Sequence, residues 1–132
     1  MSGADPRRLA AEVVRRALEE DAFAAAVLSS ELDRNPQITP RDRGLATELV
    51  YGTLRTARFL EGRLGQLAPR GTGGLSHDVR AHLRVGAYQV VFLERVPAHA
   101  AVNAAVTAIK ELRGQGLASF ANAVLRKLAT AR

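Results

Sequence analysis

Residues 79–93 constrain the fold of this chain more than any other segment. If this segment is a helix, apolar side chains cover nearly its whole circumference. A helix without a polar face is covered by other elements on several sides, so it lies at the centre of its domain. The apolar positions are Leu83, Val85, Ala87, Tyr88, Val90, Val91, Phe92 and Leu93. The sequence therefore predicts an all-α bundle built around this segment.

Helix starts can be recognised before the central segment. Asp5 with Pro6, and Thr39 with Pro40, each place an N-cap residue before a proline at the first helical position. Asp21 is expected to cap another helix between these two. Three helices are therefore predicted to begin within the first 40 residues.

The apolar pattern that begins at Thr39 continues to Ala68, which indicates one long helix. Gly52 within it indicates close contact with a neighbouring helix, or a bend. Residues 69–78 are expected to form a loop, and two more helices are expected after Pro97. No six-residue segment combines apolar–polar alternation with many β-branched residues, so strands are not expected. The prediction is a bundle of six or seven helices.

Composition limits the classes of protein that this chain can belong to. Its 132 residues, 47% hydrophobic and 24% charged, suit one globular domain over residues 1–132. The absence of cysteine excludes disulfides, thiolate zinc sites and a cysteine nucleophile. Without a run of about 18 apolar residues, we expect no membrane span and a cytoplasmic location. The net charge of +6 favours a polyanionic partner, nucleic acid above all.

No arrangement of side chains indicates catalysis. His77 and His82 are five residues apart and would splay around a helix, so we interpret them as solvated rather than metal-binding. Glu48 lies between two apolar stripes and could be partly buried in a structural ion pair with Arg55. The expectation is therefore a chain that is not an enzyme and needs no metal or cofactor.

The first predicted helix carries four arginines, namely Arg7, Arg8, Arg15 and Arg16. Arg8 and Arg15 lie about 20° apart around the helix axis, on its solvent side. Guanidinium groups bind phosphates through two hydrogen bonds and stack on bases. Glu12 is interspersed among them, so a plain solvated face with internal pairs is the alternative. An RNA site here requires these arginines to be free of internal ion pairs and of a covering subunit.

His99 and Asn103 lie four residues apart in a segment of small apolar residues, which puts them on one face of a helix. The simplest interpretation is a helix edge with a local hydrogen bond. A contact with a partner or with RNA is the alternative.

Three stretches of the chain carry a resemblance to a known family. They read DRGLATELVYGTLR (42–55), LRVGAYQVVFLERVPAHAAVNAAVTAIK (83–110) and FANAVLRKL (120–128). Their order and spacing resemble the NusB family, and most of all the NusB-type N-terminal domain of ribosomal RNA small-subunit methyltransferases of type B. The resemblance implies a NusB-type helical bundle that binds RNA.

The resemblance also implies a site and partners. Arg7, Arg8, Arg15 and Arg16 match the helix that recognises a boxA-like element of ribosomal RNA leaders, with a NusE-type ribosomal protein as partner. His99, Asn103, Arg126 and Lys127 become possible RNA or partner contacts. Arg126 stands where antitermination factors usually carry an acidic residue, and this reversal of charge puts a NusE-type partnership in doubt.

These observations lead to one main hypothesis, an RNA-binding module acting in ribosomal RNA transcription antitermination or maturation. Two alternatives stay open. One is a protein-interaction module or homodimer, suggested by the small residues of 97–108, which allow close helix contact. The other is the RNA-recruiting domain of a ribosomal RNA cytosine-5 methyltransferase whose catalytic domain lies outside this chain.

Overall fold

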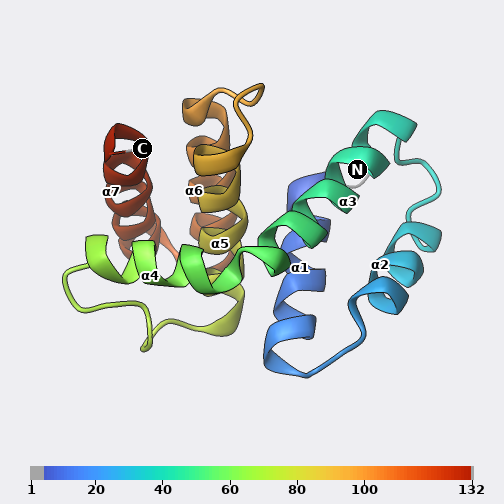
Figure 1. Cartoon of the computed structure of the whole chain (residues 1–132), viewed down its shortest axis with the longest axis horizontal. Helices are drawn as coiled ribbons and strands as arrows, with labels where there is room; N and C mark the ends of the chain where they lie inside the picture. Colours follow the sequence, from blue (N-terminus) through green and yellow to red (C-terminus); the bar gives the residue numbers. More distant parts are fainter. Residues whose placement is uncertain (1–4, 132) are drawn as a thin grey trace.

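A computed structural model describes residues 5–131 of the chain (Figure 1). These residues form helices only, joined by short connections, which confirms the predicted all-α class. There are seven helices in the described residues: α1 (Pro6–Glu19), α2 (Ala24–Asp33), α3 (Pro40–Arg55), α4 (Ala57–Leu67), α5 (His77–Phe92), α6 (Ala98–Arg113) and α7 (Gln115–Ala131). None of these helices is long and apolar enough to cross a membrane.

Helix α5 is the centre of the bundle, as its sequence predicts. It contacts α1, α3, α4, α6 and α7, and every residue from 81 to 90 is buried. Helices α5, α6 and α7 stand together in one half of the molecule, and α1, α2 and α3 form the other half (Figure 1). Helix α4 crosses the first group and contacts both α5 and α7. Helices α1, α5 and α6 thus come together where the two halves meet.

Two predicted helix starts are confirmed. The Asp5 carboxylate accepts a hydrogen bond from the backbone N–H of Arg7 at 2.9 Å, and Pro6 is the first residue of α1. The Thr39 hydroxyl accepts one from the backbone N–H of Asp42 at 3.1 Å. Each bond satisfies a backbone donor that the first helical turn leaves without a partner.

Two other boundaries differ from the prediction. Asp21 does not cap α2, because its backbone adopts a left-handed conformation (φ 57°) and the helix begins three residues later, after Phe23. The long helix expected up to Ala68 is divided at Thr56, whose backbone leaves the helical region (φ −107°, ψ 14°). The Thr56 hydroxyl donates to the carbonyl of Gly52 at 2.7 Å, which satisfies an acceptor at the end of α3.

Gly52 is a point of close helix contact, as predicted. A Cβ atom at this position would overlap the ring of Tyr88 on α5. The hydroxyl of Tyr88 then donates to the Glu48 carboxylate at 2.7 Å. Because Gly52 has no side chain, the Tyr88 ring can cross α3 at this point.

Candidate nucleic-acid interface

A hollow of about 520 Å³ lies between α1 and the helices α5 and α6. Arg8 and Arg15 of α1 line one side of it, and Arg113, in the last turn of α6, lines another. His77 and His82 of α5 complete its basic lining. The structure thus brings two of the four predicted arginines together with three basic residues that the sequence did not single out as a site.

The arginines of α1 are not free of internal ion pairs. Arg8 contacts Glu111 of α6 at 2.8 Å. Arg15 contacts both Glu12 and Glu20, each at 2.8 Å. The expectation of unpaired guanidinium groups is therefore wrong for these positions. Arg15 pairs locally, as the alternative interpretation proposed, and only Glu111 is brought to α1 by packing.

Arg16 and Arg7 lie apart from the hollow. Arg16 contacts Glu20 at 3.5 Å. The Arg7 Nε–H donates to the side-chain oxygen of Gln89 on α5 at 2.8 Å. Gln89 is only 1% exposed, and its amide nitrogen donates to the carbonyl of Val85 at 3.1 Å. Arg7 therefore joins α1 to the central helix, and the structure does not gather all four arginines on one surface.

Most groups in the pairs that rim the hollow are partly exposed. The side chains of Arg8 and Glu111 are 40% and 58% exposed. A hydrogen bond from Arg8, with the charge of the guanidinium group, lowers the pKa of Glu111, and a hydrogen bond from Arg15 does the same for Glu20. Exposed pairs of this kind contribute little to stability. The arginines can therefore exchange these carboxylates for a ligand that binds them more strongly, such as a phosphate.

His82 is a correction to the sequence interpretation, which took it for a solvated residue. It is 9% exposed, and burial, followed by the nearby charge of Arg8, lowers its pKa below the ordinary value. His77 is solvated as expected and lies 3.6 Å from Glu19. No cluster that could hold a metal ion occurs among residues 5–131.

Arg113 is the member of the hollow that sequence reasoning missed. It contacts Asp78 of α5 at 3.1 Å. In the sequence, Arg113 is a basic residue directly before Gly114, where α6 ends. Basic residues are common at helix C-termini, so this position alone does not indicate a site. Only the packing of α6 against α5 reveals that it faces α1.

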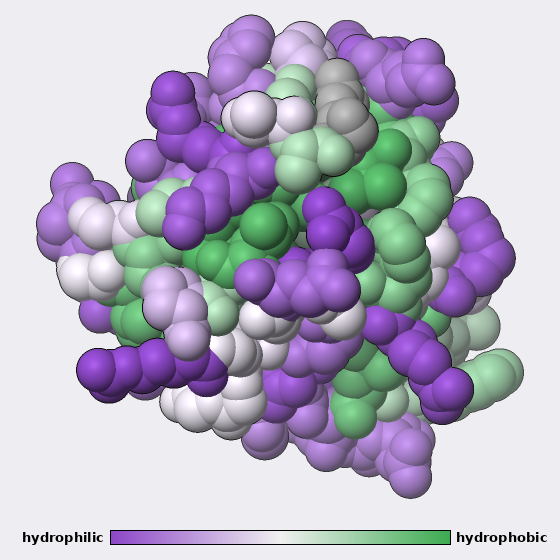
Figure 2. Space-filling model, turned by 60° about the vertical axis from the view of Figure 1, so that its left-hand side comes forward, coloured by the Kyte–Doolittle hydropathy of each residue, from purple (hydrophilic) through white to green (hydrophobic). Residues whose placement is uncertain are grey.

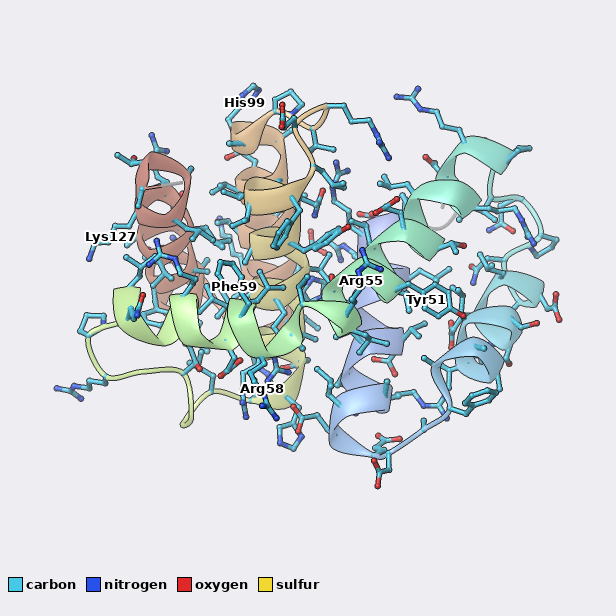
Figure 3. All side chains as sticks on the ribbon, in the orientation of Figure 1. Tyr51, Arg55, Arg58, Phe59, His99 and Lys127 are labelled. Carbon is cyan, nitrogen blue, oxygen red and sulfur yellow. The ribbon has the colours of Figure 1, made fainter. Side chains whose placement is uncertain are left out.

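A second hollow, of about 190 Å³, lies between α6 and α7. His99, Asn103 and Arg126 line it together, while Lys127 is exposed on α7 and is not part of its lining (Figure 3). No hydrogen bond joins His99 to Asn103 in the described part of the chain. The local hydrogen bond that the sequence suggested is therefore not found, and a contact role for these residues stays a prediction.

Glu48 and Arg55 do not form the ion pair expected from the sequence. Glu48 instead accepts the hydrogen bond from Tyr88, and no ion pair joins it to Arg55 within residues 5–131. Burial raises the pKa of Tyr88 and the Glu48 carboxylate raises it further, while nearby Arg55 opposes them. All three side chains meet at the Tyr88 hydroxyl.

Comparison with known proteins identifies the family. A sequence model of the NusB family matches residues 4–130. The chain belongs to the NusB family. Solved NusB structures share its fold. The antitermination factors NusB and NusE in complex with dsRNA give a TM-score of 0.87 at 17% identity, over 97% of this chain and 96% of that one. NusB of T. maritima gives 0.82 at 19% identity, over 98% and 93%.

Relatives of this NusB family member that are closer in sequence are methyltransferases. The ribosomal RNA small subunit methyltransferase B of Thermus thermophilus is 43% identical over 129 residues, which are 98% of this chain and 31% of that protein. The probable enzyme of the same name from Synechocystis is 36% identical over 121 residues, 92% of this chain and 27% of that protein. The chain thus spans less than a third of the length of these relatives.

Proposed function

We propose that this chain is a NusB-type RNA-binding module, formed by a single domain, that serves ribosomal RNA maturation. The observation that carries the proposal is the hollow beside α1, where Arg8, Arg15 and Arg113 converge from two helices. Three guanidinium groups around one concave surface suit the phosphates of an RNA strand.

The requirement for arginines free of internal ion pairs is not met, so binding proceeds instead by exchange of ion-pair partners. Arg8 and Arg113 leave Glu111 and Asp78 and contact phosphate oxygens, which accept two hydrogen bonds from one guanidinium group. The pairs that are given up involve partly exposed groups, so their loss costs little. Release of counterions from the RNA favours the exchange, and binding therefore weakens as salt increases.

The chain performs no reaction in this proposal. Its similarity to methyltransferases of which it spans less than a third favours the role of an RNA-recruiting module for the methylation of ribosomal RNA. The proposal places it in the cytoplasm, where ribosomal RNA is made.

A role in antitermination beside a NusE-type protein is the second candidate. The structural likeness to NusB bound to NusE and dsRNA supports it. The higher identity to methyltransferases, 43% against 17%, places it second.

The proposal is tested with fluorescence-labelled RNA from the small ribosomal subunit and with leader RNA carrying a boxA-like element. Substitution of Arg8, Arg15 and Arg113 by Ala is expected to weaken binding and to flatten the log–log salt dependence by about 0.7 for each phosphate that the variant no longer neutralises. Arg34→Ala is the matched control, because Arg34 is 66% exposed, pairs with Glu31 and lies at the end of α2. Equal binding by the parent and the triple variant would overturn the proposed interface.

A further inference from the structure

Four aromatic side chains lie along α3, α4 and α5, and three of them contact one another through their rings. Tyr51 and Arg55 line one hollow on α3. The Tyr88 ring packs against α3 at the wall of the same hollow. The Tyr88 ring lies 5.5 Å from that of Phe92, and Phe92 meets Phe59 edge-on at 5.8 Å between ring centroids. We call these five residues the aromatic strip.

Three of the four aromatic side chains of the strip are open to solvent. Phe59 is 51% exposed, Phe92 43% and Tyr51 41%. In Figure 3, Tyr51, Arg55 and Phe59 follow one another along α3 and α4. Figure 2, which turns the left-hand side of Figure 1 forward, shows apolar groups reaching the surface between hydrophilic ones. Contiguous exposed apolar side chains mark binding surfaces rather than ordinary protein surface.

The rings are held in place from below. Tyr88 is 3% exposed, packs against Gly52 and donates to Glu48 at 2.7 Å, so the base of the strip is fixed. Phe92 rests on this ring and presents its other side to solvent. A ligand that stacks on the strip therefore meets rings that are already ordered, which reduces the entropy lost on binding.

The cations beside the strip have no acidic partner in the described residues. Arg43 and Arg55 both line the hollow of about 540 Å³ next to Tyr51, and neither forms an ion pair there. Glu48, the carboxylate in that hollow, is engaged by Tyr88. The arginines of the α1 hollow, in contrast, all contact carboxylates. The charge of this surface is thus more available to an anionic ligand than that of α1.

We propose that the aromatic strip is a second RNA contact, which binds a single-stranded segment. Unpaired bases stack on Phe59 and Phe92, and Arg55 and Arg43 contact phosphates farther along the strand, where it follows α3. Exposed rings alternating with arginines that form no ion pair are the arrangement by which proteins hold single strands. An apolar protein surface would leave both arginines without anionic partners. The inference takes RNA as its ligand from the proposed function and so rests on it. The surface that it uses is separate from the α1 hollow.

The test measures binding of a labelled single-stranded RNA to the full chain by fluorescence anisotropy. Phe59→Ala is expected to weaken binding by about fivefold or more, and the double variant with Phe92→Ala by more still. Phe23→Ala is the matched control, because Phe23 is 76% exposed but lies before α2, outside the strip. Circular dichroism verifies that each variant is folded.

Two further variants separate stacking from apolar contact. Phe59→Trp keeps a stacking ring and, because the chain contains no tryptophan, adds a fluorophore that base stacking quenches. It is expected to bind as well as the parent and to lose fluorescence when RNA is added. Phe59→Leu keeps apolar surface without a ring and is expected to bind as weakly as Phe59→Ala.

The outcomes distinguish this inference from the proposed function. If the α1 variants weaken binding while Phe59→Ala and its double variant bind like the parent, the aromatic strip is refuted and the proposed function stands. If Phe59→Leu binds as well as the parent, a ring at this position is not needed and stacking on the strip is refuted. If the strip variants weaken binding and the α1 variants do not, the strip stands and the α1 hollow is refuted.

Discussion

The ring of Tyr88 on α5 crosses α3 directly over Gly52, at a point where any Cβ would overlap it. Gly52→Ala is expected to destabilise the protein by about 1–3 kcal/mol, because overpacking outweighs the higher helix propensity of alanine. Displacement of the Tyr88 ring also disturbs its hydrogen bond to Glu48. Urea denaturation measures the loss of stability.

Gly44 gives the matched control for this substitution. It lies in the same helix, and a Cβ there meets no atom within 4 Å. Gly44→Ala is expected to stabilise the protein by about 0.4–1 kcal/mol, since alanine restricts the unfolded chain. Equal destabilisation by both substitutions would show that contact with Tyr88 is not the cause of the loss at Gly52.

Burial of a charged side chain gives a second prediction. Arg84 is 6% exposed on α5, and it contacts Glu61 at 3.0 Å and Glu19 at 3.3 Å. Arg84→Met would leave both carboxylates without this partner and is expected to cost about 2–3 kcal/mol, less than for a fully buried pair. The midpoint of urea denaturation should fall without a change in its slope.

The control for Arg84 is a neighbour on the same helix. Arg80 contacts Glu61 at 3.3 Å, but its side chain is 21% exposed, against 7% for Arg84. Arg80→Met should therefore cost less than Arg84→Met. An Arg84 variant as stable as the parent would mean that the apolar replacement compensates for both missing ion pairs.

The sequence predicted those parts of the fold that depend on local chemistry. The caps at Asp5 and Thr39 act within three residues of themselves, and the apolar circumference of α5 is visible in the chain itself. The break at Thr56 was missed because the apolar pattern continues through it. Only contact with other helices reorients α4 there.

The candidate site was less predictable, because its residues meet only through packing. Glu111 is 103 residues away from Arg8 in the chain, yet the two groups contact each other. Burial of His82 could not be inferred from a polar residue near a helix start. Phe59 and Phe92 belong to separate helices, and neither position indicates a ring pair on its own. Sequence periodicity reports which face is apolar, and not which faces meet.

Burial of His82 predicts how the stability of the protein depends on pH. Burial lowers its pKa from the ordinary value of 6.5, so the folded state favours the neutral ring. A group of this kind contributes stability above its unfolded pKa, and the contribution is lost as pH falls below about 6.5. The melting temperature should therefore fall between pH 7 and pH 5, and His82→Gln should reduce that dependence.

His77 provides the comparison for this titration, since its side chain is 57% exposed at the mouth of the same hollow. His77→Gln makes the same substitution at an exposed position and controls for the loss of a histidine ring from this hollow. If His77→Gln flattens the profile and His82→Gln does not, the buried histidine is not the group responsible.

The contact between Arg8 and Glu111 gives the last prediction, which concerns RNA. Glu111→Gln removes the carboxylate that holds Arg8, and both side chains are partly exposed, so stability should change little. RNA binding should become severalfold tighter at low salt, and the gain should shrink as salt screens the released charge. Glu31→Gln removes the same charge beside Arg34 at the end of α2, remote from the hollow. If both variants tighten binding equally, net charge alone explains the effect, and Arg8 has no special place in the interface.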